Sequence, residues 1–326
     1  KKVWSNRNEG FGENIKKYTK FSKKIIKRKE RSMHLKLDIK NERITAENIQ
    51  NLFYTIAAVC FIYGLKQLSH PKTARNGNFI AAFGMFIAIC ITIYGGIDSE
   101  YMKSVDREVI DLFWILIGAM IGIAIGVVIA LKIKMTAIPQ MVAAFNGFGG
   151  AASALISTSE FYSSNNAFDN QTHLIAIFFS VIVGAITFTG SFIAWGKLQG
   201  KISGQPITYP GQNLINGFIL LLVIVAGYFF IVNPDNVMAF SIILCIGLLL
   251  GILSVIPIGG ADMPVVISLL NSYSGIAAAA TGFVLQNQAL IVSGCLVGAS
   301  GLFLTNIMCK GMNRSLSNVL FSAFGK

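Results

Sequence analysis

Charged residues are scarce in this sequence. They make up 13% of its 326 residues, whereas hydrophobic residues make up 54% and the mean hydropathy is +0.63. An ordinary soluble domain has about 25% charged residues. The shortage of charge therefore excludes a soluble protein and indicates one that lies in a membrane.

Histidine and cysteine are also few, and their spacing excludes the usual metal and redox sites. The five cysteines form no CxxC pair, and the three histidines are not clustered near them. The cysteines fall in or at the ends of apolar segments, where a thiol packs as a small apolar side chain. We therefore expect no bound metal.

Long apolar runs account for most of the chain from residue 47 onward. Each has about 20 residues, the length of a helix that crosses a hydrocarbon layer of about 30 Å. Lipid offers no partner for backbone polar groups, and the runs are too long and continuous for barrel strands. The sequence predicts an all-α membrane bundle of nine helices, at about residues 48–66, 78–96, 109–131, 137–157, 172–196, 212–233, 237–257, 262–285 and 288–310.

Lysine and arginine between the predicted spans are concentrated on one side of the membrane. Only Lys103 and Arg107 lie between spans on the other side. Because loops on the inner side carry the excess of basic residues, this distribution places the C-terminus inside and residue 47 outside. The ten residues on the inner side are Lys66, Lys72, Arg75, Lys132, Lys134, Lys197, Lys201, Lys310, Arg314 and Lys326.

Residues 1–46 form a basic tail that differs from the rest of the chain. The tail holds fifteen of the 27 lysine and arginine residues and supplies +10 of the net charge of +12. It has little periodic apolar face, so we interpret it as a solvated linker or a transit-type segment. A surface that binds nucleic acid or acidic lipid is the alternative; we expect no nucleic-acid partner.

Polar residues inside three predicted spans are the strongest functional signal. A polar group near the bilayer centre is costly and therefore suggests a function. Interhelical hydrogen bonds explain any one polar span, whereas three together favour a hydrated path through the bundle. The candidate path residues are Asn146 in the fourth span, Thr187, Thr189 and Ser191 in the fifth, and Ser268, Asn271 and Ser272 in the eighth. The two serines lie within one turn of Asn271, so we expect them to share or flank its face.

Glycines recur at helical spacing in two spans. Gly118, Gly122 and Gly126 lie in the third span, and Gly294 and Gly298 lie in the ninth. Small residues four apart let two membrane helices approach closely. We therefore expect both spans to pack tightly against other helices.

Four motifs, in order along the chain, resemble one known family. They are LSHPKTARNGN at residues 68–78, GAITFTGS at 184–191, GGADMPVVISLLNSYSG at 259–275 and MCKGMNRS at 308–315. They resemble the membrane part of the beta subunit of proton-translocating NAD(P) transhydrogenase, and the resemblance covers about residues 48–324. It implies an enzyme that transfers hydride between NADH and NADP+, of the Si-face to Re-face type, while protons cross the membrane inward.

The resemblance also implies partners outside residues 47–324, the predicted nine-helix domain. NAD and NADP would bind to two soluble domains, and no GxGxxG motif is present to replace them. We expect residues 325–326 to begin the linker to an NADP-binding domain. An alpha-type membrane segment and an NAD-binding domain would complete the enzyme, a homodimer. Its membrane would be a bacterial plasma membrane or the inner membrane of a mitochondrion or a plastid-like organelle.

Residues of the eighth span match positions to which the family gives a role. Asp262 and Asn271 match residues implicated in coupling and proton passage, and we group Arg314 with Asp262 at the contact with the NADP-binding domain. Asn271 would lie roughly 14 Å deeper than Asp262 and on the opposite helix face, so the two are not expected to line one narrow passage. Alternatively, Asp262 merely caps the helix that Met263 and Pro264 begin.

Asn146 departs from the pattern of many relatives, which have a proton-relaying histidine at this position. An asparagine amide does not titrate near neutral pH. Other relatives share the Asn-Gly-x-Gly-Gly pattern of residues 146–150, and in them a histidine of the alpha-type segment is thought to replace it. The resemblance therefore implies a proton path shared between two portions of the enzyme.

Two other classes of function are alternatives. An independent ion channel or secondary transporter needs no nucleotide domain, but the sequence shows no inverted repeat, no pair of broken helices and no intramembrane carboxylate. A passive membrane anchor does not need three polar spans. A Rossmann-like domain encoded after Lys326 would favour the enzyme.

Overall fold

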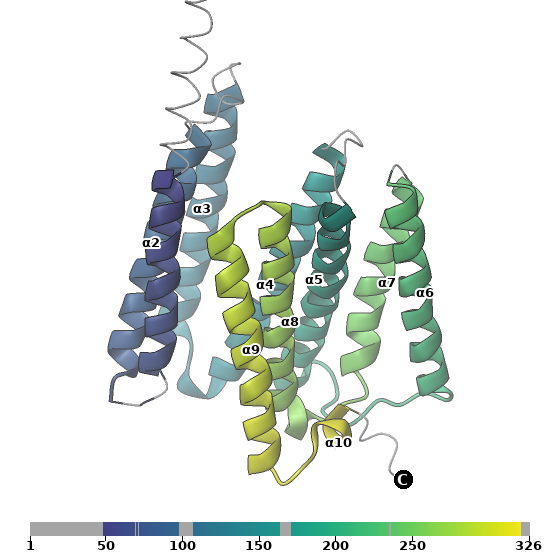
Figure 1. Cartoon of the computed structure of the whole chain (residues 1–326). Helices are drawn as coiled ribbons and strands as arrows, with labels where there is room; N and C mark the ends of the chain where they lie inside the picture. Colours follow the sequence, from purple (N-terminus) through teal and green to yellow (C-terminus); the bar gives the residue numbers. More distant parts are fainter. Residues whose placement is uncertain are drawn as a thin grey trace, which may run out of the picture.

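The computed structural model describes residues 48–68, 70, 72–97, 107–163, 171–234 and 236–320. The basic tail and the linker expected at residues 325–326 lie outside these ranges. Within them, nine helices are long and apolar enough to cross a membrane, and no strand occurs (Figure 1). The predicted all-α fold with nine spans is confirmed.

The helices follow the predicted runs closely. The first covers Asn48–Leu68. It is followed by α2 (Ala74–Ile97), α3 (Arg107–Lys132), the 3-10 turn η2 (Met135–Ala137), α4 (Ile138–Ser163), α5 (Gln171–Leu198), α6 (Gln212–Val232), α7 (Val237–Val255), the 3-10 turn η3 (Gly260–Asp262), α8 (Met263–Val284), α9 (Gln288–Gly311) and the short α10 (Leu316–Leu320).

Helix α4 extends six residues beyond the end predicted at residue 157. The prediction stopped there because the sequence becomes polar. The helix nevertheless continues, and its hydroxyls bond to its own backbone: Thr158 donates to the carbonyl of Ala154, and Ser163 donates to that of Ser159, both over 2.7 Å. These bonds satisfy the hydroxyls without breaking the helix.

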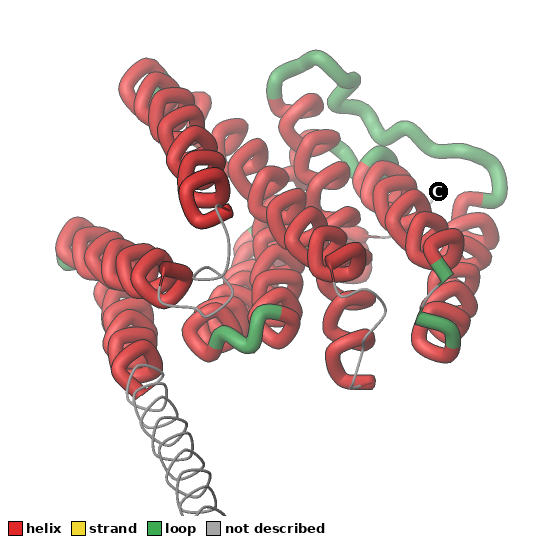
Figure 2. The backbone as a smooth tube through the Cα atoms, turned by 90° about the horizontal axis from the view of Figure 1, so that it is seen from above, coloured by secondary structure: helices red, strands yellow, loops and turns green. Residues whose placement is uncertain are grey.

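Helices α5 and α8 form the centre of the bundle. In each, 61% of the most apolar 18-residue window is buried, whereas in α3 none of it is. Helices α4, α7 and α9 pack around these two, and α6 packs on α7. The first helix, α2 and α3 stand together at one side of the molecule in both views (Figures 1 and 2).

The two glycine stripes behave differently. A Cβ atom added to Gly275 of α8 would overlap the backbone of Gly298 in α9, so these helices touch backbone to backbone as expected. In α3, by contrast, a Cβ atom on Gly118, Gly122 or Gly126 would meet nothing within 4 Å. The expected close packing of α3 is thus wrong for the part of the chain that the structure describes.

One end of the bundle collects the turns that carry the basic residues. The turns after the first helix, α3, α5, α7 and α9 lie there, at the bottom of Figure 1. We call this the inner end, following the predicted orientation, and the opposite end the outer end. Which aqueous phase each end faces stays a prediction.

Labelling of introduced cysteines tests the orientation. In a variant whose five native cysteines are replaced, Lys134→Cys lies between α3 and α4 at the inner end, and Gln288→Cys opens α9 at the outer end. Both positions are exposed. We expect a membrane-impermeant maleimide added outside intact cells or organelles to label only position 288. Labelling of both positions from one side would contradict the predicted topology.

Candidate functional site

Three central helices bring polar side chains to one depth. Helices α4 and α8 begin at the inner end and α5 ends there, so Asn146, Ser191 and Asn271 each lie seven or eight residues from that end, about 12 Å along the helix. The Nδ2 atom of Asn146 donates to Ser191 Oγ over 2.9 Å. Ser274 Oγ donates to the backbone carbonyl of Asn146 over 3.3 Å. The three polar spans therefore meet.

Asn271 lies between Ser268 and Ser274 on the surface of α8, because residues three apart on a helix are neighbours. Its side chain is half-buried and forms no hydrogen bond within the described ranges. A primary amide has two N–H donors and an acceptor oxygen. Asn271 thus holds unused hydrogen-bonding capacity beside Ser274, the residue of α8 that contacts α4.

Ser268 and Ser272 lie on a different face of α8. Ser268 Oγ donates to the carbonyl of Gly301 over 3.2 Å, and Ser272 Oγ donates to that of Gly298 over 2.7 Å. Both acceptors belong to α9. The two serines therefore flank Asn271 and join α8 to α9.

The two threonines of α5 that were predicted to line the path also point in different directions. Thr189 Oγ1 donates to the carbonyls of Leu248 in α7, over 2.8 Å, and of Ala185, over 3.1 Å. Thr187 is fully buried and donates to the carbonyl of Val183 in its own helix over 2.7 Å. Thr187 shares the α4-facing side with Ser191, four residues away, while Thr189 joins α5 to α7.

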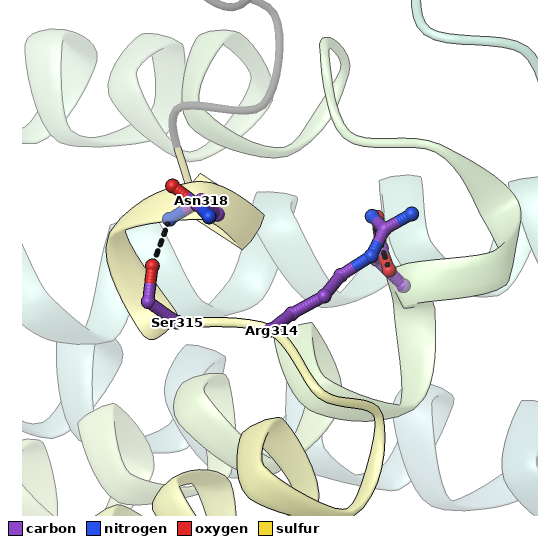
Figure 3. A network of polar contacts seen from close by, with 4 residues as sticks. Arg314, Ser315 and Asn318 are labelled. Carbon is purple, nitrogen blue, oxygen red and sulfur yellow. Dashed lines mark hydrogen bonds and ion pairs between the residues drawn. The ribbon is translucent and has the colours of Figure 1, made fainter.

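Asp262 forms an ion pair at the inner end. One guanidinium nitrogen, Nη1 of Arg314, lies 2.8 Å from Oδ2 and 3.2 Å from Oδ1 of the carboxylate. The Asp262 side chain is 7% exposed, whereas that of Arg314 is 48% exposed. Figure 3 shows Arg314 extending away from Ser315, whose Oγ accepts from the backbone N–H of Asn318 over 3.1 Å at the start of α10. The site thus presents a half-exposed cation held by a buried acid.

The carboxylate does not act as a cap through its side chain. Asp262 occupies the N-cap position of α8, but its oxygens accept no hydrogen bond from the first turn of that helix. The carboxylate oxygens accept hydrogen bonds from Arg314 instead. The geometry therefore does not support a side-chain cap, and the coupling role of Asp262 stays a prediction.

Lys197 is buried near this ion pair and was missed by the sequence analysis, which used it only to assign topology. It is 4% exposed, and its Nζ atom donates to the carbonyls of Ile256 over 2.6 Å, Ile258 over 2.7 Å and Gln205 over 3.4 Å. These acceptors use all three ammonium donors. Ile256 is the C-cap of α7, where a cation is also favoured by the helix dipole.

The lysine holds the turn on which Asp262 sits. The same turn is held from the other side, because Gly260 N donates to the carbonyl of Gly204 over 2.8 Å. Lys197 thereby fixes the inner end of α5 to the segment between α7 and α8. The spacing of Lys197 from Gly190 is the sequence signal for its burial. The two residues are seven apart, two helical turns, and therefore lie on one face of α5, and Gly190 packs against α7 and α8.

Comparison with known proteins identifies the family of this chain. The model of the family described as NAD(P) transhydrogenase beta subunit matches residues 50–326. The chain belongs to this family. Two curated relatives named NAD(P) transhydrogenase subunit beta, both from Rhodospirillum rubrum and one from a specified strain, are 45% identical to the chain over 280 residues. The alignment covers 83% of this chain and 57% of each relative.

Membership of the transhydrogenase beta family confirms the resemblance carried by the four motifs. Together with the nine described helices it makes the chain an integral, multi-pass membrane protein. The chain spans little more than half the length of these relatives. The roles predicted for Asn271, Asp262 and the other site residues stay predictions.

The role of Lys197 can be tested by removing its charge. Lys197→Met keeps the length of the side chain but leaves three buried carbonyls without a donor, and each unsatisfied group costs about 1–3 kcal/mol. We expect a lower thermal unfolding midpoint of the purified protein. Lys72→Met, which removes an exposed lysine from the turn before α2, is the control and should leave the midpoint unchanged. Equal midpoints for both variants would contradict the assigned role.

Proposed function

We propose that this chain is the proton-translocating membrane portion of an NAD(P) transhydrogenase, coupling hydride transfer between NADH and NADP+ to proton movement. The observation that carries the proposal is the meeting of Asn146, Ser191 and Ser274 inside an apolar bundle, at the depth of Asn271, in a chain of the transhydrogenase beta family. A passive anchor has no use for such a cluster, because polar groups inside a membrane are costly.

The nucleotides would bind elsewhere. A dinucleotide site is built on a strand, a glycine-rich loop and a helix, and the described ranges contain no strand. They do not fit NAD or NADP, so no binding step is assigned to them. We propose an NADP-binding domain after residues 325–326 and an NAD-binding domain with an alpha-type membrane segment as partners. Hydride transfer of the Si-face to Re-face type would take place between those two domains.

The proton path would use the polar groups of α4, α5 and α8. Asn146 and Ser191 are already paired, and Asn271 has amide capacity to spare for water. A hydroxyl that donates to a carbonyl can still accept a hydrogen bond, so the other predicted members can also contact water along the path. They are Thr187, Thr189, Ser268 and Ser272.

Coupling to nucleotide state would pass through the ion pair at the inner end. Arg314 is half-exposed there, while Asp262 is buried and lies directly before α8, the helix that carries Asn271. A domain that docks on the inner end and offers Arg314 a competing anion would loosen its hold on Asp262. We propose that an NADP-binding domain uses this contact.

The remaining assignments follow from the family. Residues 47–324 would form the membrane domain in the lipid bilayer, and residues 1–46 a separate tail. The assembled enzyme would be a homodimer in a bacterial plasma membrane or in the inner membrane of a mitochondrion or plastid-like organelle. The alternative, an independent ion channel or transporter, requires ion conductance by this chain alone in liposomes.

Replacing Asn271 tests the path. Asn271→Leu removes the amide at similar size, and we expect proton-coupled transhydrogenation by the assembled enzyme to fall at least about tenfold. Stability should change little, because the amide makes no hydrogen bond in the described part of the chain. Asn306→Leu, at an exposed position of α9, is the matched control. Coupled turnover and proton uptake into vesicles are the measurements; wild-type values for Asn271→Leu would reject the path.

Replacing Asn146 tests whether the path reaches α4. Asn146→His introduces an imidazole that titrates between about pH 5 and 8. If protons pass this position, the pH dependence of coupled turnover should change within that range. Comparing profiles for the wild type and the variant measures this. An unchanged profile in an enzyme that still turns over would place the route elsewhere.

A further inference from the structure

Polar and small residues continue along α4 from the Asn146 cluster towards the outer end. Asn146, Gly150, Ser153, Ser157 and Glu160 are spaced alternately four and three residues apart, which places them in one stripe of the helix. The stripe faces α5, as the bond from Asn146 to Ser191 shows. The function proposed above uses only its inner end.

A cluster of buried hydroxyls lies beside the outer part of this stripe. Ser180 Oγ of α5 lies 3.1 Å from the carbonyl of Ser153 in α4 and 2.7 Å from Thr281 Oγ1 of α8. Thr281 Oγ1 lies 2.9 Å from the carbonyl of Ala277. Ser180 and Thr281 are almost completely buried. The cluster therefore joins the same three helices as the Asn146 cluster, nearer the outer end.

The hydroxyl cluster has three hydrogen-bond contacts but only two hydroxyl protons. In one arrangement Thr281 donates to Ser180, and Ser180 donates to the carbonyl of Ser153. In the other, Ser180 donates to Thr281, and Thr281 donates to the carbonyl of Ala277. A hydroxyl rotates to suit its partners. The cluster can thus reverse the direction of its hydrogen bonds, as a chain that passes protons must after each transfer.

Ser157 continues the stripe one turn further out. Its side chain is fully buried, and its Oγ atom has no hydrogen-bond partner within the described ranges. A buried polar group of this kind is usually satisfied by a water molecule. Ser157 is placed to hold one between the hydroxyl cluster and the outer end of α4.

A titratable pair lies at the outer end of the stripe. Glu160 Oε1 of α4 is 3.9 Å from His173 Nε2 of α5, and their side chains are 33% and 26% exposed. On the outer turns of α4, α5, α6 and α7, the other titratable side chains with described positions are Tyr162 and Tyr228, which are both exposed. Glu160 and His173 therefore form the acid–base pair between the outer surface and the buried hydroxyls.

The stripe is interrupted between the two clusters. A Cβ atom on Gly150 would lie 2.8 Å from the carbonyl oxygen of Gly184, so α4 and α5 touch there. Helix α8 offers a way around this contact. Asn271, Ser274 and Thr281 lie on one side of α8 at spacings of three and seven residues, and Ser274 and Thr281 reach the inner and outer clusters respectively.

We propose that Glu160 and His173 collect protons from the outer aqueous phase, and that Ser157, Ser180 and Thr281 relay them to the Asn146 cluster. The proposal rests on the proton-translocating function above and adds its outer half. A proton from water binds the Glu160 carboxylate beside His173, leaves it for a water at Ser157, and passes on as each hydroxyl accepts one proton and releases another. Water molecules along α8 between Thr281 and Ser274, about 10 Å apart along the helix, would accept it from Thr281 and carry it to the Asn146 cluster. No electron or other reactant is needed.

The titratable pair is tested by removing its charges while keeping its shape. In the complete enzyme reconstituted in vesicles, Glu160→Gln and His173→Gln should each lower coupled turnover about tenfold or more. They should also change its dependence on outer pH between about pH 5 and 8, because each variant removes a group that can bind a proton. Affinity for NADPH and thermal stability should be unchanged.

The hydroxyl relay has a matched control. Thr281→Val removes a hydroxyl that reaches another helix, whereas Thr158→Val removes one that bonds only to its own helix, at the carbonyl of Ala154. We expect Thr281→Val to slow coupled turnover severalfold without moving the pH profile, because a hydroxyl does not titrate in this range. Thr158→Val should match the wild type. Ser157→Ala should behave like Thr281→Val, with the exposed Ser159→Ala as its control.

The outcomes separate this inference from the function on which it rests. A wild-type enzyme that transfers hydride without moving protons would overturn both. Wild-type coupling and wild-type pH profiles in Glu160→Gln and Thr281→Val, with Asn271→Leu inactive, would overturn the outer relay alone. An equal loss in Thr158→Val and Thr281→Val would show a packing effect and also reject the relay.

Discussion

Polar side chains inside this bundle need partners on the helices, because lipid supplies none. Most hydroxyls meet this constraint by donating to a backbone carbonyl, and between α8 and α9 the carbonyls belong to glycines. Gly298 and Gly301 of α9 have no side chains to keep α8 away, and their carbonyls accept from Ser272 and Ser268. The close backbone contact and these hydrogen bonds therefore occur at the same glycines. Together they fix the rotation of α8 against α9, and with it the direction in which Asn271 points.

Polar groups that escape this constraint are informative for the same reason. Most buried hydroxyls of α5 and α8 donate to a carbonyl, and those bonds hold the centre of the bundle together. Asn271 and Ser157 form no such bond in the described part of the chain. The proton path proposed above would give both groups a partner in water.

Much of the fold could be predicted from the sequence because the thickness of the hydrocarbon layer sets the length of a helix that crosses it. An apolar run of about 20 residues must be a helix, and nine such runs gave nine helices. The length of an apolar run does not predict polar residues that stay helical, as at the end of α4. The spacing of Gly118 and its neighbours indicates a packing face but does not say which helix covers it, and in α3 no helix lies against these glycines in the described part of the chain.

The candidate site was predictable in its residue types but not in its contacts. The polar residues of three spans could be read directly, yet the pairing of Asn146 with Ser191 depends on which helices are neighbours. The stripe that runs from Asn146 to Glu160 could be predicted from the sequence, because its residues are spaced by alternately four and three positions, close to the helical period. The carbonyls of Ile256 and Ile258 around Lys197 could not be foreseen, because they come from a turn about 60 residues further along the chain.

Helix α5 is held by both of its neighbours at several heights. Thr189 and Lys197 bind it to α7 and to the turn before α8, and a Cβ atom on Gly251 would overlap Thr189, so α5 and α7 are interlocked. On its other side, Gln140 donates to the carbonyl of Leu198, Asn146 donates to Ser191, and Ser180 donates to the carbonyl of Ser153, so α4 is tied to α5 from the inner end to the outer part. A displacement of the turn that carries Asp262 would therefore act on α5, and through α5 on α4 and α7 together.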